Sequence, residues 1–579
     1  MTGGSRLDNL PQRPTEAKFR GVILAAALGD ALGWPYENRA RNASRAPRGS
    51  LTFSDWIKRS GGRFQPHEER IPAGSYSDDT QLIIAVARSR LTNRRWWDYF
   101  SQVELPFWTL YERGGGGATI RAAKSWLKKT RPWRGAPADV ESYFKAGGNG
   151  GAMRISPHVL ARVEETFDVI AKDIVIDCVI THGHPQAIVG ALAYGFALWF
   201  ALRNRETLEY GQLITAVLES QDEWARWPDI EQVWPDWMAV ASAHNFENEW
   251  VDAVEAQASQ LKIALESLQA GALSVDQETL EALGCFDKQI LGAGTVAASA
   301  SIFLASRYAA SPMEGVAAAA FSKGADTDTI ASMTGALGGA ISGFDWLGSL
   351  VRDVQDYEFL LDLASRLQSI DAPDVVIEPI TDKYVAEFVR FLEGRGSVKI
   401  PLGLPRTIHV AEMVRSKSDN LRARSWVLND ARAQTIVIKK LDRSRSRIEP
   451  ISGQDTFKFD EASNRVQQTE FAGIGLFAAD LRKSTNFYRD LLGLPVTRET
   501  PKLIRLGSHL VLRQSDESVV AGTGTIVYIQ VNDIRACCRK LLEWGEVRPE
   551  IEQVGNRLSF ICSDPDGRTV EVFQHLTAD

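Results

Sequence analysis

Two long stretches without a charged residue, 186–202 and 289–306, constrain the fold of this 579-residue chain more than any other feature. Both are rich in Ala, Gly and Ser, and both lie in a region, from about 16 to 370, where apolar residues recur at spacings of three and four. Helices of this composition lack a polar face, so we expect them in the core of a large all-α domain and not across a membrane. Helices are predicted over 17–33, 80–91, 184–203, 294–307 and 329–343.

Glycine-rich breaks separate these helices and indicate functional loops: GDALGWP, RGGGGAT, AGGNGGAM and SKGADTD. The length predicts about two to four domains. The net charge of -7 argues against a dedicated nucleic-acid binder. The cysteines are scattered apart from Cys537 and Cys538, and the polar N-terminus lacks an apolar core, so we expect a cytoplasmic protein with free thiols and no signal peptide.

The composition changes near residue 378, and residues 378–466 are predicted to form a small accessory module or an ordered linker. VVIEPIT (375–381) and TIVIKKL (435–441) have the composition of strands. Within 403–450, eleven Lys and Arg residues stand against five Asp and Glu residues. A solvated basic face is the favoured interpretation. Nucleic-acid or phosphate contact through 403–450 is the alternative, which the lack of interleaved aromatic residues weakens.

Residues 467–577 contain the same succession of elements twice. FAGIGLFAAD precedes a helical segment, LRKSTNFYRDLLG, and then the strand pattern LIRLGSHLVLRQ. TIVYIQVND precedes a second helical segment, IRACCRKLLEWG, and then RLSFICSDPDGRTVEVFQH. Each half therefore predicts a strand, a helix and further strands, which is a duplicated βαβββ unit in an α+β domain.

Two helices of the α domain begin with an unusual concentration of oxygen donors, in SYSDDTQLI and in KGADTDTIAS. The donors are Ser77, Asp78, Asp79, Asp326, Asp328 and Thr329. Helix capping explains either segment alone, because carboxylates and hydroxyls stabilise the first turn of a helix. Together they supply more donors than two caps require, in the hard oxygen chemistry that Mg²⁺, Mn²⁺ or Ca²⁺ prefers. Divalent cations would also neutralise carboxylates that otherwise repel one another.

Five motifs follow one another along the α domain: GDALGWPYE (29–37), GSYSDDTQ (74–81), GNGGAMR (148–154), THGHPQA (181–187) and GADTDTIA (324–331). In these motifs residues 16–370 resemble the ADP-ribosylglycohydrolase family, whose founding activity removes ADP-ribose from an arginine of dinitrogenase reductase. The resemblance implies an all-α bundle with a dinuclear site for two Mg²⁺ or Mn²⁺ ions. It places the metal ligands at Ser77, Asp78, Asp79, Asp326, Asp328 and Thr329. Many members have Thr where this chain has Ser77, and the hydroxyl is kept.

The same resemblance assigns further motif residues to the substrate. Glu37 is implied to lie over the metals and to act on the ribose, whereas a surface turn is the alternative. Asp30 either orients a ligand or accepts hydrogen bonds. Glycine runs leave backbone N–H groups open to an anion, and the RGGGGAT run precedes a helix start. The substrate-binding residues are predicted to be Gly116, Gly117, Gly148, Asn149, Gly150, Met153, Arg154 and His182; for the glycines a tight turn is the alternative.

These residues predict a hydrolase that cleaves the C1″ glycosidic bond of an ADP-ribosylated protein or other ADP-ribosylated acceptor. Glu37, or an oxygen of a clustered aspartate such as Asp328, would take the proton from water. A protein that binds ADP-ribose or a drug-like molecule without turnover is the alternative. The intact acidic set disfavours it, because carboxylates clustered without cations destabilise a fold.

Residues 467–577 resemble the vicinal oxygen chelate superfamily, which includes glyoxalase I and bleomycin-resistance proteins, in GIGLFAADLRKSTNFYRDLLGLPV and SDPDGRTVEVFQ. Its members hold a metal with His and Glu residues on equivalent strands. Here Gly473, Val511 and Ile526 occupy three of those positions, and Glu571 occupies the fourth. One carboxylate holds a divalent ion poorly, so we expect no metal in this domain and a binding or packing role.

Overall fold

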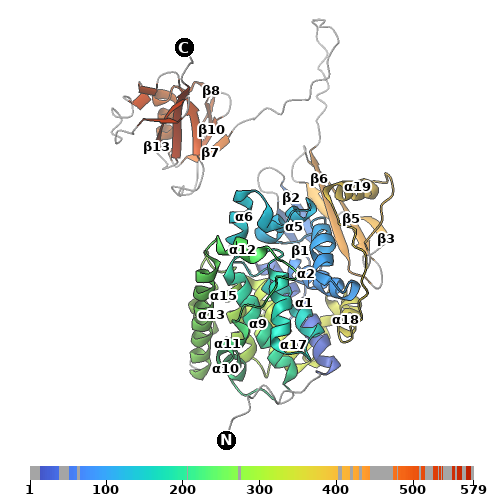
Figure 1. Cartoon of the computed structure of the whole chain (residues 1–579). Helices are drawn as coiled ribbons and strands as arrows, with labels where there is room; N and C mark the ends of the chain where they lie inside the picture. The colour runs from blue at the N-terminus through green and yellow to red at the C-terminus, as the bar shows by residue number, and fades with distance from the viewer. Residues whose placement is uncertain are drawn as a thin grey trace. The chain divides into compact units, whose positions relative to one another are not determined.

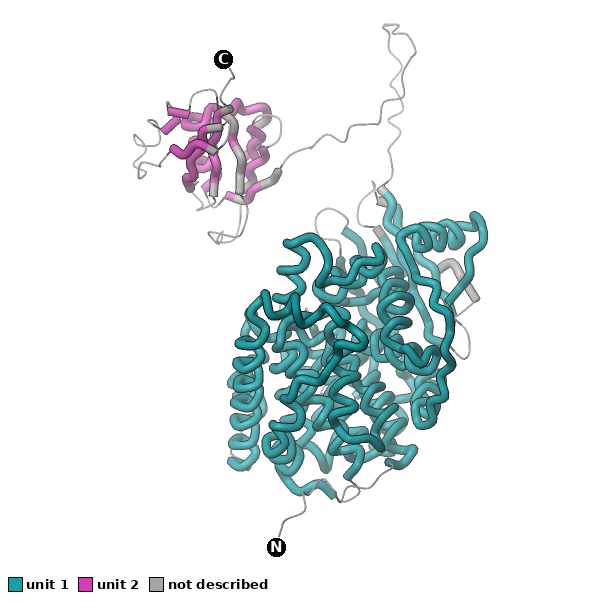
Figure 2. The backbone as a smooth tube through the Cα atoms, viewed as in Figure 1, with its two compact units in different colours: residues 1–449 teal, residues 450–579 magenta. Residues whose placement is uncertain are grey.

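The computed structural model describes residues 14–37, 51–60, 66–204, 207–271, 275–401, 407–411, 413–416, 421–429, 433–443, 474–478, 480–501, 503–506, 510–514, 526–531, 534–535, 537–538, 551–554, 557–563 and 569–575. The chain divides into two compact units, residues 1–449 and 450–579 (Figure 2). Each unit has its own cluster of buried apolar side chains. The prediction of a helical domain followed by a strand-rich domain is confirmed.

The N-terminal unit is built mainly from helices (Figure 1). They are α1 (Glu16–Gly33), α2 (Asp78–Thr92), α3 (Trp96–Tyr99), α4 (Leu105–Trp108), α5 (Gly117–Leu127), α6 (Pro137–Phe144), α7 (Ser156–Ala161), α8 (Phe167–Cys178), α9 (Pro185–Arg203), α10 (Gln212–Glu219), α11 (Gln221–Trp224), α12 (Trp237–Ser242), α13 (Phe246–Gln269), α14 (Asp276–Ala282), α15 (Gly294–Arg307), α16 (Pro312–Ala320), α17 (Thr327–Ser342), α18 (Tyr357–Arg366) and α19 (Asp382–Leu392). The five helices predicted from periodicity correspond to α1, α2, α9, α15 and α17.

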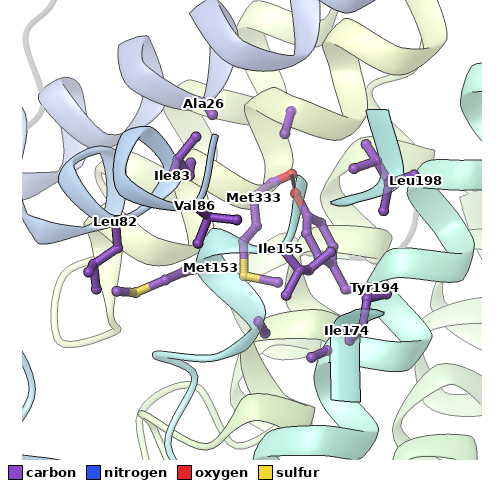
Figure 3. Packing of buried hydrophobic residues seen from close by; sticks show 14 of the residues in the cluster. Ala26, Leu82, Ile83, Val86, Met153, Ile155, Ile174, Tyr194, Leu198 and Met333 are labelled. Atoms are coloured by element: carbon purple, nitrogen blue, oxygen red, sulfur yellow. Dashed lines mark hydrogen bonds between the residues drawn. The ribbon is translucent and has the colours of Figure 1, made fainter. Parts of the chain in front are cut away.

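The apolar helices α9 and α15 are buried, as their composition predicts. By length and composition α9 could cross a membrane, but 94% of its apolar window is buried inside the protein. Small residues let the two helices approach closely, because a Cβ atom on Gly190 of α9 would lie 2.2 Å from the carbonyl carbon of Gly294 of α15. The core continues into α17, where the carbonyl oxygen of Met333 accepts a hydrogen bond of 3.4 Å from the Tyr194 hydroxyl (Figure 3).

The N-terminal unit contains two antiparallel sheets, one of which joins segments that are far apart in the sequence. One sheet has the order β1 (Trp56–Ser60), β2 (His67–Ile71) and β4 (Val414–Ser416). The other has the order β3 (Thr407–Ala411), β5 (Leu421–Asn429) and β6 (Ile436–Arg443). Trp426 and Ile438 belong to the same buried cluster as the helices. The described part of the predicted accessory module therefore packs as part of the helical unit.

One strand prediction in this region is wrong. Residues 375–381 form no strand, although residues 436–441 of TIVIKKL lie in β6 as expected. The segment bonds instead to the residue that caps α2 and to the π-helix Phe100–Glu104 that follows α3. The Val375 carbonyl accepts a hydrogen bond of 2.7 Å from the Asn93 side chain, and the Ile380 N–H donates one of 2.8 Å to the Gln102 carbonyl. Pro379 also lacks the N–H that a sheet requires.

The C-terminal unit contains two sheets of identical topology. The first has the order β7 (Ile474–Ala478), β10 (Leu510–Gln514), β9 (Leu503–Leu506) and β8 (Val496–Thr500), and the helix α20 (Leu481–Asn486) follows β7. The second has the order β11 (Ile526–Gln530), β14 (Thr569–His575), β13 (Arg557–Ser563) and β12 (Glu552–Val554). In each half the first and last strands pair in parallel, and the other pairs are antiparallel. This repeat confirms the duplication that the sequence predicts.

Candidate active site

The close packing of α1 against α17 brings two distant motifs together. The helices run antiparallel and touch through glycines, because a Cβ on Gly29 would lie 2.2 Å from the Ala331 carbonyl oxygen, and one on Gly33 would lie 2.3 Å from the Thr327 oxygen. The Thr327 hydroxyl also donates a hydrogen bond of 3.0 Å to the Gly33 carbonyl. The end of α1, which carries GDALGWPYE, therefore lies beside the start of α17, which carries GADTDTIA.

Asp30 of α1 holds the start of α2 next to the end of α1 and the start of α17. Its carboxylate accepts hydrogen bonds from the Ser77 N–H at 2.9 Å, the Thr80 N–H at 3.0 Å and the Thr80 hydroxyl at 2.6 Å. The two N–H groups are unpaired donors of a helix N-terminus, and a buried carboxylate satisfies them well. Of the two roles considered for Asp30, accepting hydrogen bonds is the one seen in the structure.

The two acidic helix starts meet between α2 and α17. The Asp79 carboxylate accepts a hydrogen bond of 3.2 Å from the Thr329 hydroxyl of α17 and one of 3.4 Å from the Ser77 hydroxyl. Asp78, Asp79 and Asp328 are 6%, 2% and 3% exposed. Burial raises the pKa of all three carboxyls well above the usual range, and the charges of neighbouring acidic groups raise it further. The four predicted carboxylates thus act on one another electrostatically across the two helix starts.

Glu37 lies close to both acidic segments. It follows the turn η2 (Trp34–Tyr36), and its N–H donates to the Trp34 carbonyl at 3.4 Å. After burial, the charge of Glu37 contributes most to the raised pKa of Asp78 and also to that of Asp328. The side chain is half-buried, so the carboxylate is near the cluster without being enclosed by it.

The chemistry of the cluster fits divalent cations. Among the described residues, Asp79 Oδ1 is buried and accepts no hydrogen bond, so one oxygen of this carboxylate lacks the partner that a cation would supply. Burying several carboxylates without counter-charge is costly, and cations would remove that cost. Within the same described part of the chain, however, no three His, Cys, Asp or Glu side chains are grouped closely enough to form a metal site by themselves. The hydroxyls of Ser77 and Thr329 and water would have to complete the coordination.

The GNGGAMR loop reaches the cluster through one side chain. The Asn149 amide donates a hydrogen bond of 2.8 Å to Asp326 Oδ2. The loop is held in place by the segment before α15, because Gly148 bridges to Ala293 and the Asn149 N–H donates to the Gly292 carbonyl at 2.8 Å. The structure therefore brings four of the five motifs together, because GDALGWPYE, GSYSDDTQ and GNGGAMR all lie beside GADTDTIA.

Two predicted substrate-binding residues of this loop lie in the protein interior. Met153 is 4% exposed and packs among apolar side chains that include Leu82 and Val86 (Figure 3). Arg154 is 0% exposed. It donates hydrogen bonds to the Gly150 carbonyl at 2.6 Å, to the Asp177 carboxylate at 2.7 Å and to the Thr181 hydroxyl at 2.9 Å. In the structure these two side chains support the loop from the protein interior, and their contact with a substrate stays a prediction.

His182 also lies beneath the loop. It is 2% exposed, and a Cβ atom on Gly150 would lie 2.9 Å from its Cε1 atom. The Thr181 hydroxyl lies 2.7 Å from His182 Nδ1, within hydrogen-bond distance. Burial, with the nearby charge of Arg154, lowers the pKa of His182 to about 3, so the ring is neutral at ordinary pH. Asp177 and His158, which sequence reasoning missed, complete this buried network with a contact of 3.0 Å.

The glycine run before α5 borders the acidic cluster. A Cβ on Gly114 would lie 2.9 Å from Asp78 Oδ1, whereas one on Gly116 would meet nothing within 4 Å. The N–H groups of Gly114 and Gly115 already donate to Glu112 Oε2 at 3.2 and 3.1 Å. The free part of the predicted phosphate cradle is therefore the helix start at Gly116 and Gly117, both of which are exposed.

The β1–β2 hairpin contributes residues that no sequence motif indicated. Lys58 Nζ lies 5.0 Å from the ring centroid of Trp34, and Trp56 packs edge-on against Trp34 at 5.1 Å. The charge of Lys58 acts to lower the pKa of Asp78, whereas the charges of its acidic neighbours raise it. A basic and aromatic surface therefore lies beside Glu37 and Asp78.

Three of the four predicted positions of the C-terminal unit lie on described strands. Val511 lies on β10 and Glu571 on β14, which are the equivalent last strands of the two halves, and Ile526 lies on β11, the first strand of the second half. Gly473 lies outside the described residues. The absence of a metal in this unit and its binding role stay predictions.

Comparison with known proteins supports the division into two units. A model of the ADP-ribosylglycohydrolase family matches residues 11–374, and one of the Glyoxalase/Bleomycin resistance protein/Dioxygenase superfamily matches residues 470–572. The chain is 24% identical over 344 residues to ADP-ribosylhydrolase ARH3 of Homo sapiens, which covers 57% of this chain and 86% of that protein. It is 29% identical over 217 residues to ARH3 of Gallus gallus, covering 36% and 56% of the two chains.

A bacterial relative and a solved structure show the same likeness. ADP-ribosylarginine hydrolase Tri1 of Serratia proteamaculans is 23% identical over 206 residues, which is 34% of this chain and 50% of that protein. This chain thus spans about half the length of the Gallus gallus and Serratia relatives. A structure titled "ADP-ribosylglycohydrolase-related protein complex" covers 61% of this chain and 97% of its own, at 20% identity and a TM-score of 0.38.

Proposed function

Because the chain belongs to the ADP-ribosylglycohydrolase family, we propose that it hydrolyses the C1″ glycosidic bond of ADP-ribosylated acceptors at the cluster between α2 and α17. The observation that carries this proposal is the hydrogen bond of 3.2 Å between Thr329 and Asp79, which ties the two acidic helix starts together. Such a concentration of carboxylates at two helix starts exceeds what capping requires. The named relatives ARH3 and Tri1 are described as ADP-ribosyl hydrolases, which supports the reaction class.

The donor set suits two Mg²⁺ or Mn²⁺ ions, which we propose Ser77, Asp78, Asp79, Asp326, Asp328 and Thr329 would hold. When bound, such ions act as Lewis acids, orient oxygen ligands and lower the pKa of water. The protein's own residues set the geometry of the cluster. Asp30 fixes the start of α2, and the Asn149 amide, through its 2.8 Å hydrogen bond, fixes the carboxylate of Asp326.

The proposed reaction breaks the bond between ribose C1″ and the acceptor atom and forms a bond between C1″ and a water oxygen. Glu37, half-buried beside Asp78 and Asp328, would take one proton from that water. An oxygen of Asp328 is the alternative base. The acceptor leaves with a proton, which balances the one that the base took from water, so the products are free ADP-ribose and the unmodified acceptor. The exposed helix start at Gly116 and Gly117 is proposed to bind the diphosphate, because N–H groups there attract anions.

The test is release of ADP-ribose from substrates modified on arginine, on serine and on DNA, each with Mg²⁺ and with EDTA. Wild-type protein should release ADP-ribose from at least one substrate, and EDTA should abolish the release. The variants Asp326→Ala and Asp328→Ala should remain folded and inactive. ADP-ribose binding without release from any substrate would contradict hydrolysis and favour the binding-protein alternative. Full activity in both variants would place the chemistry elsewhere.

A further inference from the structure

Residues 434–439, which comprise the first part of β6 and the two residues before it, contact the residues that support the acidic cluster at three separate points. They lie beyond residue 374, where the match to the ADP-ribosylglycohydrolase family ends. In the sequence they belong to a segment with no recognised motif. In the structure they lie against β2, against the turn between β2 and α2, and against α2 itself.

The first contact is an ion pair that reaches the first residue of α2. Lys439 of β6 lies 3.2 Å from the Glu69 carboxylate of β2, and Arg113 lies 3.0 Å from the same carboxylate. Arg113 is 4% exposed and Glu69 is 1% exposed. Burial acts to raise the pKa of Glu69, but the charges of Arg113 and Lys439 outweigh it and hold the pKa below the usual value. The Arg113 carbonyl in turn accepts a hydrogen bond of 3.1 Å from the N–H of Asp78.

The second contact reaches the residue before Ser77. Thr435 donates to the Asp356 carboxylate twice, from its N–H at 2.8 Å and from its hydroxyl at 2.6 Å. The same carboxylate accepts a hydrogen bond of 2.6 Å from the hydroxyl of Tyr76, whose side chain is 1% exposed. A further hydrogen bond holds the turn between β2 and α2, because the Gln355 N–H donates to the Gly74 carbonyl at 2.9 Å.

The third contact reaches the body of α2. Gln434 Oε1 accepts a hydrogen bond of 2.8 Å from Arg88 of α2. Arg88 also makes a buried ion pair of 2.8 Å with Glu104. Gln434 is itself 0% exposed, so this contact is shielded from water.

We propose that residues 434–439 form a brace that positions Tyr76, Ser77, Asp78 and Asp79, and that Thr435 and Lys439 are positioning residues of the candidate active site. Each contact is polar and is buried or partly buried. The first leads to Asp78 and the second to Tyr76, next to Ser77, whereas the third holds α2 at Arg88. Partners that orient ligands in this way typically change metal affinity or activity by about 10- to 100-fold when they are removed. The functional unit therefore extends past the family match to include β6.

The test compares three full-length variants with wild type: Lys439→Met, Lys439→Arg and Lys440→Met. Lys440 is the matched control, because it is adjacent on β6 and pairs with Glu393 and Asp442 instead, at 2.6 and 3.5 Å. The measurements are Mn²⁺ affinity by electron paramagnetic resonance, hydrogen exchange of the amides of residues 76–80, and kcat and KM for ADP-ribose release. We expect Lys439→Met to weaken Mn²⁺ binding and lower kcat by about 10- to 100-fold and to speed exchange at 76–80.

Lys439→Arg keeps the charge and should recover most of both losses, and Lys440→Met should match wild type. Equal Mn²⁺ affinity and equal exchange in Lys439→Met and Lys440→Met would overturn the proposal. Where Lys439→Met does not fold, Thr435→Val against Thr435→Ser decides, since only the first removes the hydroxyl. The kinetic readout rests on the proposed function, but the exchange readout does not. Wild-type protein without hydrolase activity would overturn that function and leave the brace to be judged by exchange at 76–80.

Discussion

Replacing Gly33 with Ala should separate α17 from α1 at the acidic cluster. A Cβ atom at position 33 would lie 2.3 Å from the Thr327 carbonyl oxygen and 2.7 Å from the Asp328 Cα atom. Both are backbone atoms, so no side-chain rotation relieves the clash. Non-bonded contacts to carbon normally lie near 3.5 Å, so the start of α17 has to move away from α1 by about 1 Å.

Overpacking of this kind costs about 1–3 kcal/mol of folding free energy. The effect on activity should be larger, because a displacement of about 1 Å at an active site can cost about 100-fold in rate. Gly21→Ala is the matched control. Its Cβ would lie 2.4 Å from the Gly343 carbonyl oxygen, so the clash is similar, but it occurs about 18 Å away along the helix pair.

The assays are unfolding by denaturant, Mn²⁺ affinity and the rate of ADP-ribose release. Both variants should lose similar stability, whereas only Gly33→Ala should lose metal affinity and about 100-fold in rate. Wild-type activity and Mn²⁺ affinity in Gly33→Ala would show that the position of Asp328 does not depend on this contact. An equal loss of activity in Gly21→Ala and Gly33→Ala would show that the loss follows stability and not the position of Asp328.

Three further predictions concern single side chains. Mn²⁺ at 100 times its Kd should stabilise wild-type protein by about 2.7 kcal/mol in thermal melts, and Asp79→Asn should abolish this shift; an equal shift in both proteins would exclude Asp79 as a ligand. Asn149→Ala removes the donor to Asp326 and should lower Mn²⁺ affinity about 10- to 100-fold in titration calorimetry, a result that unchanged affinity would contradict. The pKa of His182 falls from 6.5 to about 3 on folding, so the unfolded chain binds the extra proton and stability decreases as pH falls from 6.5 to 3. His182→Gln should therefore unfold at lower pH than wild type in circular dichroism, and an unchanged midpoint would show that this histidine does not limit acid stability.

Features of the fold that depend on local pattern were predictable. The helices α1, α2, α9, α15 and α17 follow from apolar periodicity, because a helix bonds within its own segment. The duplicated unit near the C-terminus follows from the repeated order of its elements. The pairing of two acidic helix starts was predictable from donor chemistry, since neither start needs that many oxygens as a cap.

Features that depend on contacts between distant residues were not predictable. The strand β2 pairs with β4, whose residues lie more than 300 positions later in the chain, and no local pattern indicates that pairing. The same limit applies to Lys439, which reads as a surface charge in the sequence and proves to face buried Glu69. Arg154 reads as an anion ligand within a glycine-rich motif, yet Asp177, 23 positions later, holds it in the interior.

Occupancy of the cluster between α2 and α17 can be observed by X-ray diffraction from crystals soaked with Mn²⁺ and ADP-ribose, recorded at a wavelength where manganese scatters anomalously. We expect manganese peaks between Asp79 and Asp328, with the ribose next to them and the diphosphate at the start of α5. Manganese or ADP-ribose bound elsewhere, with the cluster between α2 and α17 left empty, would contradict this expectation.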